Sequence, residues 1–209
     1  MLHKISLFFT GVLISLLSIC SLSAQLEPHQ ASTIQTVQMA TTDTVNDYSD
    51  SIRTELVRQT DAYISQKFPK SKLTGEALVM ACEKHDFDIC FALAQAEIES
   101  GLGTAGKAKR TNNPWNVGAW NGRSVQTMNK LGYGYSHPDQ SIEPYIELVK
   151  TKYLGDKRTI HDLMVQYTTL SGHRYASDPD YERTLKSTYH RICTKTALRE
   201  LQDLLKRVV

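Results

Sequence analysis

The amino-acid sequence predicts an all-α fold that carries one small lobe, either irregular or a β-hairpin. Two observations support this fold class. Apolar residues recur at helical spacing over most of the chain from about residue 47 onward. Between residues 101 and 136 this period is lost, and Gly, Asn, Trp and Tyr become frequent. No internal repeat is visible, so we expect residues 47–209 to form a single domain.

The segment before this domain is predicted to hold an export signal and a flexible leader. Lys4 supplies a positive charge, and an apolar run follows over residues 7–19. Small residues then favour cleavage before Gln25, and the run is shorter than the roughly 20 residues of a membrane span. Residues 1–24 are therefore expected to be a signal peptide, with a retained anchor as the alternative. Residues 25–46 are rich in Gln, Ser and Thr and show no period, as in a flexible leader.

Helices are expected on both sides of the lobe. A first helical run covers residues 48–68, and Pro69 stops it. Thr74 can cap a second helix. Residues 89–100 are apolar on most sides, which predicts a helix at the buried centre of the domain, ended by Gly101. Four more helices are expected after the lobe, over residues 141–153, 160–169, 181–192 and 196–206.

Charge and cysteine content exclude some classes of function. The formal net charge is +2 and no clustered Lys/Arg face emerges, so nucleic-acid binding is not expected. Cys82, Cys90 and Cys193 follow the signal segment and lie in apolar surroundings, which predicts small core residues, with one disulfide as an alternative for an exported chain. No Cys or His pair has metal-ligand spacing, so neither a metal nor an organic cofactor is implied.

Two carboxylates stand in the apolar central helix, within residues 94–101. Glu99 lies in its last turn, where the helix dipole disfavours a negative charge. Burial acts in the same direction and raises the pKa of a carboxyl, so that it can donate a proton to a leaving oxygen. The alternative is that Glu97 and Glu99 reach solvent or form ion pairs with Lys107 or Arg110.

The amino-acid sequence around Glu99 resembles that of a known family. Residues 94–103, Ala-Gln-Ala-x-x-Glu-Ser-Gly-x-Gly, are similar to the catalytic-helix motif of the glucosaminidase family of peptidoglycan hydrolases, which share a lysozyme-like fold. Residues 175–181, Tyr-Ala-Ser-Asp-Pro-x-Tyr, are similar to a later signature of that family. Residues 111–118 and 135–145 resemble the two signatures between these. The four blocks keep the family's order and cover most of the chain after the leader.

The resemblance implies that Glu99 is the general acid and that Tyr175 points into the cleft. Tyr175 would hold a water, donate to an acetamido group or polarise the intermediate; the alternative is a buried ring that ties the C-terminal helices together. Flat aromatic faces and side-chain amides of the lobe predict sugar contacts, and Trp115 and Tyr135 have a second interpretation as the lobe's own small core. The predicted substrate-binding residues are Ser100, Asn112, Trp115, Asn116, Trp120 and Tyr135.

One departure from the family pattern concerns the second carboxylate. No Asp or Glu occurs between Ser100 and Pro138, and Asp139 and Glu143 are the nearest later candidates. Three mechanisms remain open: attack by the substrate's own N-acetyl group, inversion with a carboxylate from elsewhere in the fold, or a lytic closure of the muramic 6-hydroxyl. The first and the third are our hypotheses, with Glu99 as the acid in each.

The predicted function is therefore an exported hydrolase of peptidoglycan glycan strands, in the periplasm, in the cell envelope or secreted. An endo-β-N-acetylglucosaminidase is the first choice and a lytic transglycosylase the second. We expect a monomer with no membrane span after signal cleavage. Two rivals from other classes are a non-catalytic wall-binding module and a thiol protease that uses Cys82 or Cys90 with His173.

Overall fold

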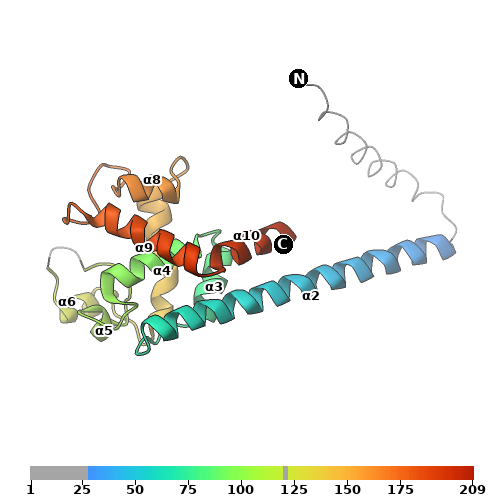
Figure 1. Ribbon diagram of the computed structural model, residues 1–209, viewed down its shortest axis with the longest axis horizontal. Coiled ribbons are helices and arrows are strands. Elements are labelled where there is room, and N and C mark those ends of the chain that lie inside the picture. Colours follow the sequence, from blue (N-terminus) through green and yellow to red (C-terminus); the bar gives the residue numbers. More distant parts are fainter. Residues whose placement is uncertain (1–27, 120–121) are drawn as a thin grey trace, which may run out of the picture. The chain divides into compact units, whose positions relative to one another are not determined.

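The computed structural model describes residues 28–119 and 122–209, and these residues are helices joined by irregular segments (Figure 1). They contain no strand, only an isolated antiparallel bridge between Thr168 and Arg174. The predicted all-α fold is thereby confirmed. The predicted signal peptide lies outside the described residues, as do Trp120 and Asn121 of the predicted hairpin.

The first described helix, α2, covers Pro28–Lys67 and begins well before the start that periodicity predicts. The structure describes residues 28–46 as part of this helix, which the sequence pattern did not predict. This stretch has no apolar stripe and hence no amphipathic signal, but adding a residue to an existing helix gains one hydrogen bond without a new nucleus. Pro28 suits a first helical position, where its missing N–H has no partner to lose. That this segment acts as a leader stays a prediction.

The compact unit that holds the candidate site begins at Ser49. Ile52, Leu56 and Ile64 bring the buried face of α2 into its core. The next helix, α3 (Gly75–Lys84), begins where predicted, because the Thr74 hydroxyl accepts a hydrogen bond from the backbone N–H of Ala77.

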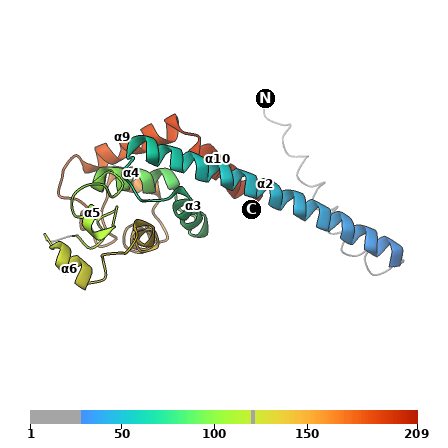
Figure 2. The ribbon, with the colours of Figure 1, turned by 90° about the horizontal axis from the view of Figure 1, so that it is seen from below.

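The central helix is α4, Ile89–Ser100, with the predicted bounds. The Asp88 carboxylate caps its start by accepting from the Phe91 N–H at 3.0 Å. Gly101 ends it in the left-handed conformation, at φ +55°. All residues from 89 to 96 are 0% exposed, so the prediction of a buried central helix is confirmed. It packs most extensively against α9, Tyr181–Lys195, which Figure 2 shows alongside it.

The lobe between α4 and the later helices holds two short helices, α5 (Ala108–Thr111) and α6 (Val125–Lys130). Asn113 organises the chain between them, since its buried amide donates to the carbonyls of Val117 and Tyr133. Gly118, at φ +79°, lies against the Tyr133 ring, and a Cβ there would meet Tyr133 Cγ at 2.3 Å. The lobe is thus packed around its own polar and aromatic groups rather than around a hairpin.

The later helices differ from prediction mainly at their ends. The helix predicted over residues 141–153 consists of three joined pieces: η1 (Pro138–Ser141), α7 (Ile142–Leu148) and the π-helical η2 (Val149–Leu154). Another, α8 (Ile160–Val165), ends early because the Arg158 guanidinium binds the carbonyls of Gln166 and Thr168. The last, α10, covers Leu198–Val208.

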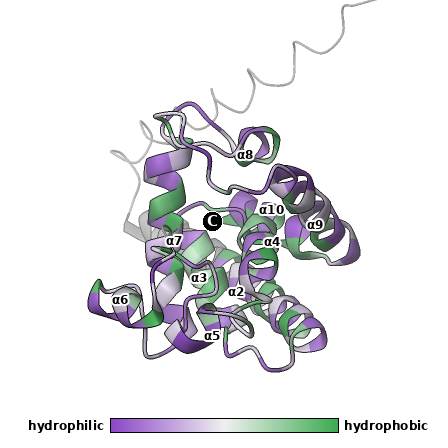
Figure 3. Ribbon diagram, turned by 90° about the vertical axis from the view of Figure 1, so that its left-hand side faces the viewer, coloured by the Kyte–Doolittle hydropathy of each residue, from purple (hydrophilic) through white to green (hydrophobic). Residues whose placement is uncertain are grey.

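Helices of this unit carry hydrophilic residues beside hydrophobic ones, as expected for helices that bury one face (Figure 3). Trp115 and Tyr145 stack inside the core with ring centroids 4.6 Å apart. Within the two described stretches of the chain, no helix combines the length and the apolar composition needed to cross a membrane.

Candidate active site

The candidate site lies at the C-terminal end of α4, where Glu99 meets side chains from the lobe and from the later helices. Tyr181, at the start of α9, donates its hydroxyl hydrogen to Glu99 Oε1 at 2.6 Å. Asn116 and Tyr175 lie beside this carboxyl and lower its pKa; Asn116 Nδ2 donates to the backbone carbonyl of Glu99 at 3.0 Å, and the Tyr175 hydroxyl donates to the carbonyl of Trp115 at 3.4 Å. The structure therefore brings together the predicted residues Glu99, Asn116 and Tyr175, and it adds Tyr181.

Burial dominates the electrostatics of this carboxyl. Desolvation raises the pKa of Glu99 above its usual value, and the polar groups of Tyr181, Asn116 and Tyr175 beside it oppose this shift without cancelling it. All three groups are neutral. Such surroundings favour a carboxyl that keeps its proton to a higher pH than an exposed one, which is the property a general acid needs.

Asn116 joins the lobe to the end of α4. Its backbone is left-handed, at φ +51°, and its Nδ2 donates to the backbone carbonyl of Glu99 at 3.0 Å. Its Oδ1 is buried and has no hydrogen-bond partner among the described residues. Of the two polar atoms of the Asn116 side chain, only the amide nitrogen forms a hydrogen bond within the described part of the chain, and its acceptor is the backbone carbonyl of Glu99.

The tyrosines beside Glu99 form one aromatic cluster. Tyr175 stacks on Tyr167, with centroids 4.4 Å apart, and lies 5.2 Å from the Tyr181 ring. Burial raises the pKa of Tyr175 well above its usual value, and the negative charge of Glu99 adds to this effect. Tyr175 stays a neutral phenol, so it can orient a partner by hydrogen bonding but cannot act as an anionic base near neutral pH.

Two predicted substrate-binding residues are instead structural. Trp115 is 0% exposed and donates its indole N–H to the carbonyl of Ala92, so its faces cannot stack on a sugar. Ser100 is also buried; its hydroxyl donates to the carbonyl of Pro114 and accepts from the Gly103 N–H. Both predictions are wrong for the same reason: the lobe packs on α4 through these side chains.

The remaining predicted contacts have different outcomes. Asn112 donates to the carbonyls of Tyr135 and Ser136, so its amide nitrogen joins the first and last parts of the lobe to each other. Tyr135 is partly exposed, and it stays a candidate for substrate contact. Trp120 lies outside the described residues.

Both candidate second carboxylates bind groups at the ends of α3. The Asp139 carboxylate accepts from the backbone N–H and the hydroxyl of Thr74, at 2.9 and 2.8 Å. Glu143 forms ion pairs with Lys84 and His85. Glu97, the other acid of α4, pairs with Arg191 at 2.5 Å rather than with Lys107 or Arg110.

Sequence reasoning missed two residues of the site, Tyr181 and Gln95. Gln95 is 0% exposed and its Nε2 lies 3.4 Å from the Tyr181 hydroxyl. The available signal was spacing: Gln95 precedes Glu99 by four residues, one turn along the same helix face. A polar residue at that position in an apolar helix is typical of a group that has a buried partner.

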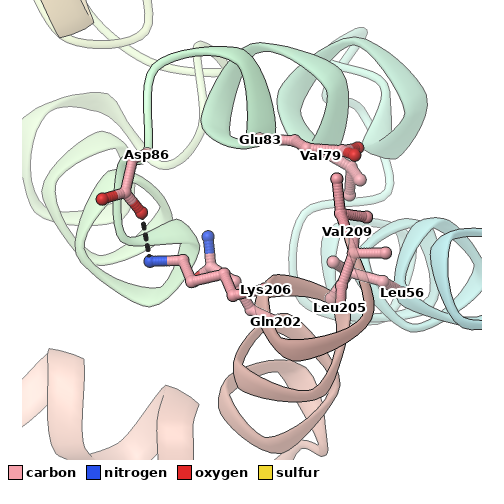
Figure 4. A pocket seen from close by; sticks show the side chains of 8 residues that line it. All are labelled: Leu56, Val79, Glu83, Asp86, Gln202, Leu205, Lys206 and Val209. Atoms are coloured by element: carbon pink, nitrogen blue, oxygen red, sulfur yellow. Dashed lines mark ion pairs between the residues drawn. The ribbon is translucent and has the colours of Figure 1, made fainter. Parts of the chain in front are cut away.

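Several hollows lie outside this cluster, and one of about 480 Å³ between α3 and α7 is lined by Asp139 and Glu143. A second, of about 230 Å³, forms where the lobe meets α7, and Val117, which follows Asn116, lines it together with Glu147. A third, of about 330 Å³, lies between α2, α3 and α10, beside the ion pair of Asp86 with Lys206 (Figure 4). None of the predicted site residues lines the third one. Its lining residues are Leu56, Val79, Glu83, Asp86, Gln202, Leu205, Lys206 and Val209.

A helical domain with a buried carboxyl at the end of its central helix has the features of a glycosidase of the lysozyme-like superfamily. The chain belongs to the glucosaminidase family of peptidoglycan hydrolases: the family model described as "Mannosyl-glycoprotein endo-beta-N-acetylglucosaminidase" matches residues 75–194. A search of curated proteins finds no match to this chain. Family membership supports a role as a glycoside hydrolase that acts on peptidoglycan.

Proposed function

We propose that this protein cleaves the β-1,4-linked glycan strands of peptidoglycan as an endo-β-N-acetylglucosaminidase, with Glu99 as the general acid. The observation that carries the proposal is the partly buried Glu99 side chain, whose pKa is raised by desolvation and whose Oε1 receives a hydrogen bond from Tyr181 at 2.6 Å. We further propose that the chain is exported, because its substrate class lies outside the cytoplasmic membrane.

The proposed reaction uses the substrate's acetamido group as the nucleophile. Its carbonyl oxygen attacks the anomeric carbon while Glu99 transfers its proton to the leaving glycosidic oxygen. The carboxylate that results then takes a proton from a water molecule as the water oxygen bonds to the anomeric carbon. The bond from this carbon to the acetamido oxygen breaks, which restores the acetamido group and gives net retention of configuration. In this proposal Tyr175, which stacks on Tyr167 and whose hydroxyl lies 3.4 Å from the Trp115 carbonyl, would turn its hydroxyl to the acetamido group. The engagement of Asp139 and Glu143 with groups at the ends of α3 favours this route over one that needs a second carboxylate.

Purified peptidoglycan provides the test. Incubation with the protein should release fragments with a reducing N-acetylglucosamine end, identified by mass spectrometry, and NMR of the first product should show the β-anomer. Glu99→Gln should lower the rate by at least about a hundredfold, since general acid catalysis contributes roughly 10²–10⁴. Glu97→Gln, two residues away on the same helix, is the matched carboxylate control and should retain activity below its unfolding temperature.

Other outcomes select the alternatives. A 1,6-anhydro muramic end would select lytic cleavage by the same Glu99. An α-anomer, together with loss of activity in Glu147→Gln, would select inversion with a base from the hollow beside the lobe. Binding to insoluble peptidoglycan without any released fragment would select the non-catalytic module and contradict the proposal.

A further inference from the structure

Gln95 holds a buried polar group at the centre of the tyrosine cluster. Its Oε1 accepts hydrogen bonds from the hydroxyls of Tyr145 and Tyr167, at 2.8 and 3.0 Å. Its Nε2 donates to the Tyr181 hydroxyl at 3.4 Å. A buried amide is costly unless both of its ends are paired, and here both are.

The two tyrosines at Oε1 decide which way the amide points. Two phenols direct their hydrogens at Oε1, so the amide nitrogen faces the opposite side, toward Tyr181. An amide N–H can only donate. The Tyr181 oxygen therefore accepts from Gln95, and its own hydrogen is directed at Glu99 Oε1, 2.6 Å away.

This arrangement distinguishes the two oxygens of Glu99. A carboxyl oxygen that receives the Tyr181 hydrogen is the poorer place for a second one, so the acid proton resides on Oε2. Resting on the proposed function, we infer that Gln95 is a positioning residue: through Tyr181 it keeps the transferable proton of Glu99 on Oε2. Gln95 touches neither the substrate nor the reacting atoms in this role.

The first test is Gln95→Met, which keeps the side-chain length and removes both ends of the amide. Tyr181 then loses the donor that directs its hydrogen, and its bond to Glu99 weakens. Because that bond favours the ionised form, the alkaline limb of the kcat–pH profile should move to higher pH. We expect kcat to fall on the order of 10- to 100-fold with little change in KM, as for a displaced catalytic group.

The control is another buried glutamine. Gln202 accepts from the Ile89 N–H and donates to the carbonyl of Phe87, away from the tyrosine cluster. Gln202→Met should therefore lower the unfolding temperature without moving the pH limb. In a Tyr181→Phe background the alkaline limb should already be displaced. Adding Gln95→Met should then displace it no further, because the hydroxyl through which Gln95 acts is absent.

A second variant tests the same inference if Gln95→Met fails to fold. Tyr145→Phe combined with Tyr167→Phe leaves Gln95 in place but frees its amide to turn, so the same displacement of the limb is expected. The inference is overturned if these variants lower only the unfolding temperature, with an unchanged pH limb. A full additional displacement by Gln95→Met in the Tyr181→Phe background would equally overturn it.

Carbon-13 NMR titration of the Glu99 carboxyl separates this inference from the proposed function. It reports the pKa of Glu99 without any turnover. If the wild type releases no fragments, the proposed function fails, yet the pKa of Glu99 should still be higher in Gln95→Met than in the wild type and unchanged in Gln202→Met. An unchanged pKa in Gln95→Met, in an active enzyme, overturns the positioning role alone.

Discussion

At the scale of single residues, the position of Glu99 lowers the stability of the fold but raises the pKa of its carboxyl, as the proposed general acid requires. Glu99 lies in the last turn of a buried helix, where both desolvation and the helix dipole disfavour its charge. The hydrogen bond from Tyr181 and the nearby polar groups of Asn116 and Tyr175 offset part of this cost, but the pKa of Glu99 remains raised. The folded protein thus holds a carboxyl that would be more stable as a neutral group.

Glu99→Gln is therefore expected to raise the unfolding temperature near neutral pH while it removes activity. Because the pKa of Glu99 is raised in the folded state, its favourable contribution is complete below the usual value of 4.5 and is lost as pH rises through the folded-state pKa. Glutamine carries no charge at either pH. Calorimetry at about pH 7.5 should show the gain, and at about pH 4 the gain should vanish. A gain of equal size at both pH values would contradict the raised pKa.

At the scale of elements, α4 is tied to other helices at both ends. Near its start, the Asp88 carboxylate accepts from the Tyr189 hydroxyl and pairs with Arg199, each at 2.9 Å. Near its end, Glu97 pairs with Arg191 of α9 and accepts a short hydrogen bond from Tyr63 of α2. These contacts hold the helix that presents Glu99 against neighbours on several sides.

Glu97→Gln tests the tie at the end of α4. The Glu97 side chain is 15% exposed and Arg191 29%, so the pair is partly desolvated, and Glu97 raises the pKa of Arg191. Loss of a partly buried hydrogen bond to a charged group should lower the free energy of unfolding by about 1–3 kcal/mol in urea denaturation. The pH profile of activity should not change. A loss of activity as large as that of Glu99→Gln would instead point to Glu97 as the acid.

At the scale of the whole molecule, the compact unit begins close to the predicted domain boundary. Ser49 is 7% exposed and Ile52 is 5% exposed, whereas Val45 and Tyr48 are about half exposed. Among the side chains that the structure describes from residue 45 onward, burial of α2 in this core therefore begins at about Ser49. The part of α2 before it stays helical in the structure but adds no buried apolar residue from 45 to 48.

A chain that starts at residue 47 is expected to keep both the fold and the activity. Since the compact unit begins at Ser49, the unfolding temperature should change by no more than a few degrees, less than roughly 1 kcal/mol for a domain of this size. Fragment release from peptidoglycan should proceed at the wild-type rate. Loss of soluble folded protein would show that the preceding residues belong to the domain.

Patterns within a few residues predicted the helices well. The bounds of α4 followed from its apolar run and from Gly101, and the start of α3 followed from Thr74. The failures at α2 and α8 have local causes as well: one helix extends through polar residues without a stripe, and the other ends where Arg158 captures its carbonyls. Neither a stripe nor a cap marks such ends in the sequence.

The sequence by itself determined the fold class, the family and the choice of Glu99, because helical period, caps and motif spacing join residues that are near one another in the chain. Only the tertiary structure decided which polar groups meet. Tyr181 reaches Glu99 from 82 positions away, and Gln95 is hydrogen-bonded to tyrosines from three later segments. Trp115 and Ser100 became core for the same reason. Contacts between elements depend on how helices pack, and no short-range pattern records that packing.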